Sequence, residues 1–255
     1  MQNSDLFYKH YDDLYFSKKY DEEIDCMVAL AKNYYPKKIN KVLEIGTGTG
    51  NHTIHLAKKR FNVVTIDTDK KMISAASKKI TRAKFPNVKL LNFSVENLKE
   101  KNFDFAIAGF NVVNYLQDFT SLQTFFKAIF SRLKTNGLLI FDCWNGVAAI
   151  ADPPKSKLIQ SKDGEHFISC NILSSADFMN QKCTLTYHLS IKNENGKEID
   201  SGKFSFEQIL WTPMEISYCL KNSGFRVLKC SRHFQPEIAA NENDWKIMYV
   251  CQKIS

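Results

Sequence analysis

The residues with the clearest capacity for chemistry lie in one short segment, 42–53, which reads VLEIGTGTGNHT. Gly46, Gly48 and Gly50 directly follow an apolar run that is typical of a buried strand. Glycine lets the backbone turn tightly and lets a ligand approach closely. The residues after Gly50 have a helical pattern, and a helix directs its free N–H groups and positive dipole end back toward such a turn. We therefore predict a ligand-binding turn between a strand and a helix.

The glycine spacing and a nearby acid distinguish between two classes of cofactor. Dinucleotide-binding turns have the spacing G-x-G-x-x-G, with a pyrophosphate at the helix N-terminus. Here the spacing is G-x-G-x-G, and Asn51 stands in the place of the third glycine. Glu44 lies in the strand before the first glycine, where a carboxylate opposes a pyrophosphate but suits an ammonium group. S-adenosylmethionine (SAM) carries an ammonium, a sulfonium and a carboxylate, so the pattern favours SAM.

A second acid, Asp67, ends the next predicted strand at the expected distance from the glycines. A carboxylate about 20 residues beyond such a turn accepts hydrogen bonds from the ribose hydroxyls of an adenosine. The alternative is a sharp strand-to-helix turn followed by a solvated surface aspartate. The strand acid, the three glycines and Asp67 together favour cofactor binding.

Two segments resemble the motifs of a known family. The stretch 42–50 is similar to the first motif of the class I SAM-dependent methyltransferases, and IDTD at 66–69 is similar to the second. The resemblance implies SAM as the cofactor and S-adenosylhomocysteine as the product. The cofactor site that it implies around the strand ends comprises Glu44, Gly46, Thr47, Gly48, Asp67, Thr68, Met72, Ser94, Val95 and Phe110.

Within this implied site, the resemblance gives most residues a specific part of SAM. Gly46 and Gly48 line the methionine and ribose part of the cofactor, and Asp67 holds the ribose diol. Thr68 and Met72 flank the adenine. The motif loops are thus expected to contact the whole length of the cofactor.

The adenine end departs from the family pattern at one position. The family often has an acid after the third strand, which accepts a hydrogen bond from the adenine amino group, and here Ser94 occupies that position. A hydroxyl can also accept a hydrogen bond, although it lacks the charge of a carboxylate. The backbone amide of Val95 is expected to serve adenine N1.

Looser likenesses point to a subgroup of the family. Tyr11, Tyr15 and Tyr20, the loop FNVVNYL at 110–116 and the stretch WTPME at 211–215 resemble small-molecule N-methyltransferases, including the nucleotide-linked amino-sugar N,N-dimethyltransferases. In this comparison the three tyrosines close over SAM, with a hydroxyl reaching its carboxylate. The structural alternative is that they pack an N-terminal helix on the domain.

The resemblance places the transferred methyl group near the carboxyl ends of the first and fourth strands. Asn111, Asn114 and Tyr115 follow the fourth strand and are the candidate catalytic residues that orient the acceptor. Capping or packing of the next helix is an alternative role for Asn114 and Tyr115. Asp142 and Trp144 end the fifth strand and are further candidates for the pocket, with a purely structural role equally open for Trp144.

Methyl transfer from a sulfonium needs an oriented nucleophile and the exclusion of water, but no metal. An amine acceptor must be neutral, so its proton passes to a nearby acceptor group or to water. The hypothesis is methyl transfer to an amine nitrogen of a small molecule, with an amino group on a nucleotide-linked sugar as one candidate. The alternatives are O-methylation of a small carboxylate or hydroxyl, RNA methylation, and a non-catalytic SAM-binding protein.

The order of predicted elements indicates an α/β fold. Strands alternate with helices over residues 40–142, with helices expected over 70–83 and over 119–134, the second stopped by Asn136-Gly137. This alternation predicts parallel βαβ units and a Rossmann-like, doubly wound, mostly parallel sheet. A further helix is expected over 213–222. The strand-like runs in 150–210 lack intervening helices and predict an antiparallel β insertion, placed over the active site. We expect one methyltransferase domain over 1–255, with an N-terminal helical cap over 1–39.

Composition narrows the possible partners and the compartment. The formal net charge is +8, but the lysines are scattered and no nucleic-acid-binding module is recognisable, which argues against a nucleic-acid substrate. No apolar run reaches the length needed to span a membrane, and the N-terminus lacks a signal-peptide core. Seven cysteines without a C-x-x-C pair fit free thiols in a reducing compartment. We therefore expect a cytoplasmic protein, either a monomer or a homodimer.

Several other polar residues are weaker candidates. His52 and His55 lie three positions apart on a predicted helix, but no third ligand with fitting spacing accompanies them, so we expect no metal and interpret them as solvated or helix-packing side chains. Glu207 and His188 lie on insertion strands, where a solvated strand face explains each better than a role as general base.

Overall fold

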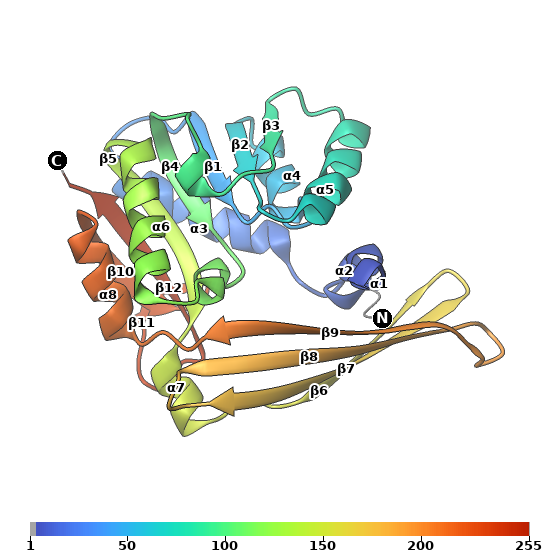
Figure 1. Ribbon diagram of the computed structural model, residues 1–255. Coiled ribbons are helices and arrows are strands. Elements are labelled where there is room, and N and C mark those ends of the chain that lie inside the picture. The colour runs from blue at the N-terminus through green and yellow to red at the C-terminus, as the bar shows by residue number, and fades with distance from the viewer. Residues whose placement is uncertain (1–3, 255) are drawn as a thin grey trace. The chain divides into compact units, whose positions relative to one another are not determined.

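The computed structural model describes residues 4–254, which form two compact units (Figure 1). The larger unit comprises residues 19–151 and 210–254, and we call it the Rossmann-like unit. The smaller comprises residues 4–18 and 152–209, and we call it the sheet unit. Among the helices of the described residues, none has the length and hydropathy needed to cross a lipid bilayer.

The Rossmann-like unit is built on an eight-stranded sheet with the order β11-β10-β12-β5-β4-β1-β2-β3. Strands β3, β2, β1, β4 and β5 are parallel, whereas β12 runs antiparallel to β5 and to β10. The prediction of a Rossmann-like, mostly parallel sheet is thus confirmed. The strands of this sheet are β1 (Lys41–Ile45), β2 (Asn62–Ile66), β3 (Val88–Leu91), β4 (Phe103–Ala108), β5 (Leu133–Trp144), β10 (Phe225–Arg232), β11 (Gln235–Ala239) and β12 (Lys246–Lys253).

Helices cover both faces of this sheet (Figure 1). On one face, α3 and α4 contribute Ile24, Met27 and Leu56 to an apolar cluster with side chains of β1, β4, β5 and β12. On the other, Phe126 of α6 packs on Phe141 of β5. Each fully buried apolar side chain of this size stabilises the fold by about 1.5–3 kcal/mol. The helices of this unit are α3 (Tyr20–Tyr34), α4 (Asn51–Lys58), α5 (Lys70–Ala83), η1 (Val95–Asn97), η2 (Val112–Tyr115), α6 (Phe119–Arg132), α7 (Gly146–Ala151) and α8 (Pro213–Asn222).

The strand order fixes where a ligand can bind. The chain leaves β1 toward β2 and β3 and then crosses back to β4 on the other side of β1. In open α/β sheets, such a switch point leaves a crevice at the carboxyl ends of the two central strands, and ligands bind there. The glycine segment follows β1 and the segment 109–116 follows β4, so both candidate segments start at this crevice.

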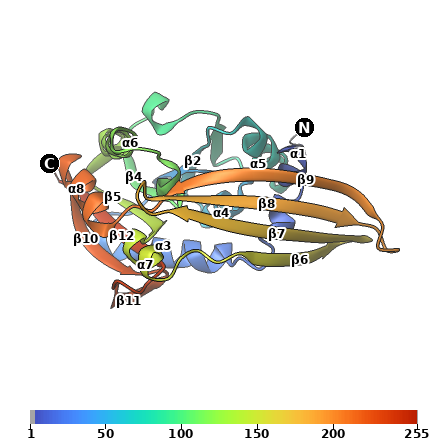
Figure 2. The same ribbon diagram turned by 60° about the horizontal axis from the view of Figure 1, so that its bottom comes forward.

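The sheet unit contains the predicted antiparallel insertion. Its four strands lie side by side in the order β6-β7-β8-β9, and each pairs antiparallel with the next (Figure 2). One face of the sheet is apolar, and Phe7 packs there against Tyr187, Phe204 and Phe206. The elements of this unit are α1 (Ser4–Lys9), α2 (Tyr11–Leu14), β6 (Lys157–Asp163), β7 (His166–Asp177), β8 (Lys182–Lys192) and β9 (Glu198–Ile209).

The N-terminal residues that the sequence suggested as one helical cap are divided between the two units. Helices α1 and α2 belong to the sheet unit, whereas α3 belongs to the Rossmann-like unit. The position of the insertion over the active site stays a prediction.

Candidate active site at the carboxyl ends of β1 and β4

The three motif glycines have positive φ angles, but each meets a different environment. Gly46 has φ of 81°, and a Cβ there would lie 2.4 Å from Cγ2 of Val112. Gly50, with φ of 85°, packs so closely on α5 that a Cβ would lie 3.1 Å from that of Ala76. Gly48, with φ of 54°, has no atom within 4 Å of the place its Cβ would take. Gly46 and Gly50 therefore serve close packing, and Gly48 borders open space that suits a ligand.

Gly48 is joined directly to the acid of the second motif. Its backbone N–H donates to Oδ2 of Asp67 over 2.8 Å, and the N–H of Asp69 donates to Oδ1 over 2.9 Å. Burial raises the pKa of Asp67, against the lowering effect of these backbone hydrogen bonds. The carboxylate therefore lies beside the open space at Gly48, held by the main chain and positioned for further donors.

Glu44 is a buried acid beneath the same loop. Its side chain is 1% exposed, and Oε2 accepts hydrogen bonds from Thr53 over 2.5 Å and from Thr65 over 2.7 Å. Burial raises the pKa of Glu44. Its second oxygen, Oε1, is buried and has no hydrogen-bond partner among the described residues. Because an unsatisfied buried acceptor is costly, Oε1 fits an N–H donor from a ligand or from bound water.

Thr47 has a structural role in the loop. Its hydroxyl makes a 2.6 Å hydrogen bond with that of Thr65 and is buried, while its N–H donates to the carbonyl of Ile66. The side chain is therefore engaged within the protein, and it helps to fix the loop on β2.

The predicted adenine residues follow β2 and β3 at the same edge of the sheet. Thr68 is exposed, and Met72 is half-buried in the first turn of α5. Ser94 precedes η1 and accepts a hydrogen bond from Nδ2 of Asn97 over 3.2 Å, while Val95 is buried. The four residues thus begin two consecutive helical segments, and their contact with adenine stays a prediction.

The segment after β4 contains two consecutive residues with strained backbone. Phe110 has φ of 67° and Asn111 has φ of 60°. The left-handed region is rare for residues other than glycine, and each such residue costs on the order of 1–3 kcal/mol. Asparagine tolerates it better than phenylalanine does. Strain of this kind is typical of functional sites, where the surrounding contacts hold it.

Asn111 is the buried polar residue of this segment. It is 4% exposed, and its backbone N–H donates to Oδ1 of Asp142 over 3.2 Å. Its own Oδ1 is buried without a hydrogen-bond partner among residues 4–254. The next residue, Val112, is the one that contacts Gly46. Asn111 therefore has an unpaired acceptor atom and is the sequence neighbour of the residue that contacts the first motif glycine.

Asp142, at the end of β5, is fully buried and accepts a second hydrogen bond. Nε2 of His233 lies 3.1 Å from its Oδ2. Burial pushes the pKa of Asp142 upward, but the hydrogen bond and charge of His233, with the charge of Lys246, outweigh it and lower the pKa to about 2. Sequence reasoning considered Asp142 and missed His233, because no local pattern marks a histidine between two strands as a partner of a residue 91 positions away.

The other two predicted acceptor residues have different environments. Asn114 is fully buried, and its Oδ1 accepts the backbone N–H of Trp144 over 2.9 Å. It thereby ties η2 to the end of β5. Tyr115 is 47% exposed, and its carbonyl accepts a hydrogen bond from Gln117. Their roles toward an acceptor stay predictions.

The three N-terminal tyrosines do not lie in one unit. In the sheet unit, Tyr11 packs on Tyr15, and the hydroxyl of Tyr15 makes a 3.1 Å hydrogen bond with that of Tyr187. In the Rossmann-like unit, the ring of Tyr20 packs edge-on against His52, with 4.9 Å between the ring centres. Their closure over SAM stays a prediction.

His52, set aside in the sequence as solvated or helix-packing, is buried at the start of α4. Its Nε2 lies 2.7 Å from Oε2 of Glu23 in α3, and its ring borders Gly109 at the end of β4. No group of three or more His, Cys, Asp or Glu side chains within the described part of the chain is arranged to hold a metal ion. His52 is therefore a packing residue that joins α3 to α4.

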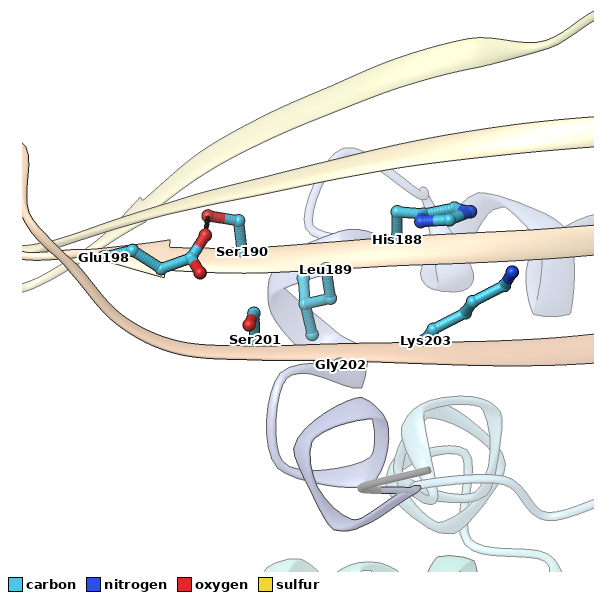
Figure 3. A pocket seen from close by; sticks show the side chains of 7 residues that line it. All are labelled: His188, Leu189, Ser190, Glu198, Ser201, Gly202 and Lys203. Carbon is cyan, nitrogen blue, oxygen red and sulfur yellow. Dashed lines mark hydrogen bonds between the residues drawn. The ribbon is translucent and has the colours of Figure 1, made fainter. Parts of the chain in front are cut away.

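The sheet unit has an open depression between β8 and β9 (Figure 3). His188 and Lys203 point to the same side there, and Ser190 donates to Glu198 over 2.6 Å. Glu207 lies beyond it, 3.5 Å from Lys182. The depression holds no paired acid and base aimed at a common point, in keeping with a solvated strand face. Its lining residues are His188, Leu189, Ser190, Glu198, Ser201, Gly202 and Lys203.

The chain is similar to known methyltransferases. Residues 42–137 match the family model of a methyltransferase domain. A putative methyltransferase of Bacillus subtilis, YqeM, is 25% identical over 229 residues, which cover 88% of this chain and 87% of that protein. The matched domain and this relative support a SAM-dependent methyltransferase.

Solved structures extend the likeness beyond the matched domain. A SAM-dependent methyltransferase from Clostridium acetobutylicum has a TM-score of 0.79 and 20% identity, and covers 99% of both chains. The sugar N-methyltransferase KedS8 from Streptoalloteichus also has a TM-score of 0.79, with 15% identity, over 100% of this chain and 94% of that one. These matches span both units of the chain, so its whole fold, and not only residues 42–137, is that of known methyltransferases.

Proposed function

We propose that this methyltransferase transfers the methyl group of SAM to a nitrogen atom of a small molecule, with amino groups on nucleotide-linked sugars as the first class to test. The observation that carries the proposal is the buried, unpartnered Oδ1 of Asn111 at the carboxyl end of β4. KedS8, a sugar N-methyltransferase with the same fold, supports the choice of an amine.

The chain's residues fit SAM at the edge formed by β1 and β2. The open side of Gly48 leaves room for the ligand, the carboxylate of Asp67 suits a ribose diol, and Oε1 of Glu44 lacks the donor that an ammonium group or a bound water would provide. When bound, SAM supplies a methyl group that its sulfonium already activates. The protein then has to orient the acceptor and exclude water.

Asn111 suits the task of orienting an amine. Its Oδ1 can accept one N–H of a neutral amine, which leaves the nitrogen lone pair to be directed at the methyl group. Because Val112 packs on Gly46, the segment that carries Asn111 is in direct contact with the glycine loop. After the transfer, the surplus proton of the methylated amine passes to water.

A hydroxyl acceptor could also donate a hydrogen bond to Asn111, but its methylation requires a base in addition. An alcohol must lose its proton to become a good nucleophile, and this requires a base. The carboxylate that contacts Asn111, that of Asp142, is already engaged by the Asn111 N–H and by His233. The site therefore favours a neutral amine over an alcohol.

The test is a methylation assay with matched acceptor panels. Purified protein is incubated with SAM and either nucleoside-diphosphate amino sugars and simple amines, or the corresponding hydroxyl sugars and carboxylates. Release of S-adenosylhomocysteine and the mass of the product are measured. We expect methylation in the amine panel only. Methylation confined to the hydroxyl or carboxylate panel would overturn the nitrogen assignment, and absence of SAM binding in calorimetry would overturn the cofactor site.

A further inference from the structure

His233 lies in the turn between β10 and β11, far along the chain from the motif loops. Its backbone N–H donates to the carbonyl of Lys246 in β12 over 3.2 Å, which holds the turn on the neighbouring strand. Its ring Nε2 lies 3.1 Å from Oδ2 of Asp142. The position of the ring is thus set by the edge hairpin of the sheet, and not by the residues around the glycine motif.

Asp142 connects this hairpin to the segment after β4. One carboxylate oxygen contacts His233, and the other accepts the backbone N–H of Asn111 over 3.2 Å. The carboxylate is fully buried, and its contact with the Asn111 N–H is shielded from water, whereas the His233 ring is 21% exposed. Hydrogen bonds to an ionised group are stronger than those between neutral groups, and burial strengthens them further. Asp142 is therefore a rigid bridge between His233 and Asn111.

We propose that His233 and Asp142 form a positioning pair, which holds Asn111 in its left-handed conformation and thereby sets the acceptor nitrogen against the methyl donor. This inference rests on the function proposed above. Both residues act through Asn111, and neither needs to touch the substrate. Phe110 and Asn111 both have left-handed backbone, which is strained. Two such consecutive residues relax unless a contact holds them, and the hydrogen bond from the Asn111 N–H to Asp142 is such a contact.

The charges around Asp142 keep its carboxylate ionised and able to accept two hydrogen bonds. His233 faces it from the β10–β11 turn and Lys246 from β12, while the neutral N–H of Asn111 faces it from the segment after β4. Cys143, its neighbour on β5, has a pKa raised by burial and stays neutral. Without His233, burial would dominate and the pKa of Asp142 would rise. Protonation would then weaken the hold on Asn111.

The first test follows the Asn111 amide proton by NMR and needs neither cofactor nor substrate. In the native protein, protonation of Asp142 should produce no inflection of the Asn111 signal above about pH 5, because Asp142 stays ionised there. In His233→Phe the inflection should move up into this range. His233→Gln, whose amide can still donate to Asp142, should lie between the two, and His166→Gln, at an exposed position that begins β7, should match the native protein. Identical titration curves in His233→Phe and the native protein would overturn the proposal.

The second test measures kinetics with an acceptor from the amine panel. We expect His233→Phe to lower kcat about tenfold, to shift the acidic limb of the pH profile upward and to leave the dissociation constant of SAM unchanged. His233→Gln should recover much of the rate. Unchanged kcat and an unchanged pH profile in His233→Phe, with SAM binding intact, would refute the positioning role. Failure of the proposed function would look different, because the native protein itself would then methylate no amine.

Discussion

The backbone N–H of Gly48 donates a 2.8 Å hydrogen bond to the carboxylate of Asp67. This contact joins the first and second sequence motifs, which are 19 positions apart in the chain. It orients the acid toward the one motif glycine whose side is open. The part of the proposed cofactor site that would face the ribose is therefore already assembled by the main chain.

Replacement of Asp67 by Ala should weaken SAM binding about 10–100-fold, because charge-assisted hydrogen bonds contribute roughly 1.5–3 kcal/mol each. Calorimetry measures the effect, and Asp69→Ala at the start of α5 is a matched control that should cost helix stability more than affinity. Since burial raises the pKa of Asp67, SAM affinity in the native protein should fall as the pH drops through that raised pKa. An affinity that stays constant down to about pH 4, near the usual pKa of an aspartate, would contradict this role.

Alanine at Gly46 and alanine at Gly48 should differ in their main effect, which is on stability at Gly46 and on SAM binding at Gly48. At Gly46 the new Cβ would collide with Val112, so the fold should lose stability, and Val112→Ala in the same chain should restore part of it. At Gly48 the Cβ meets no protein atom, so the cost should be about 1–2 kcal/mol for its left-handed backbone. SAM binding should nevertheless be lost. Thermal denaturation and calorimetry separate the two effects, and full SAM affinity in Gly48→Ala would exclude this loop as the cofactor cradle.

Replacement of Glu44 by Gln should stabilise the protein while it weakens SAM binding. Burial raises the pKa of Glu44 in the folded protein. The protonated carboxyl therefore contributes stability below the unfolded-state pKa, and this contribution is lost as the pH rises through the folded-state pKa. The variant should thus gain on the order of 2–4 °C in Tm at neutral pH, and nothing at about pH 4. A Tm difference that does not change with pH would show that the ionisation of Glu44 is not the cause.

Asn111 and Asn114 offer a contrast between an acceptor residue and a structural one. Asn111→Ala should reduce kcat/KM for the amine about tenfold, because one hydrogen bond to the acceptor is lost. Asn114→Ala should instead lower the free energy of unfolding by about 1–3 kcal/mol, because the backbone N–H of Trp144 loses its partner. Steady-state kinetics and denaturant unfolding test the pair. Equal effects of both variants on both quantities would remove the distinction.

Local signals predicted the elements that begin with strong caps. The helix predicted over 213–222 is observed at those bounds, where Thr212 and Glu215 form a capping box ahead of Pro213. The helix predicted over 70–83 is likewise observed, with Asp69 as its N-cap. In both cases the side chain that accepts a hydrogen bond from an N–H of the first helical turn is a sequence neighbour of that turn. The pattern is therefore visible without tertiary contacts.

The predictions failed where pairing between distant strands decides the element. Helix α6 was expected to reach residue 134 and to stop at Asn136-Gly137, but it ends at Arg132 because Leu133 already pairs with Phe103 in the sheet. Strands β6 and β11 were not predicted, since both lie at sheet edges, where most side chains are exposed and the apolar alternation is weak.

The sequence by itself determined the alternation of strands and helices over residues 40–142, the glycine turn and the acid at Asp67, because each depends on residues that are close together in the chain. Only the tertiary structure decided that Asp142 lies between Asn111 and His233, which are 31 and 91 positions away from it. It also decided that Val112 contacts Gly46 and that the hydroxyl of Thr47 faces Thr65. The physical reason is that side-chain partners in a sheet are chosen by strand order and register, and these emerge only when the whole chain packs.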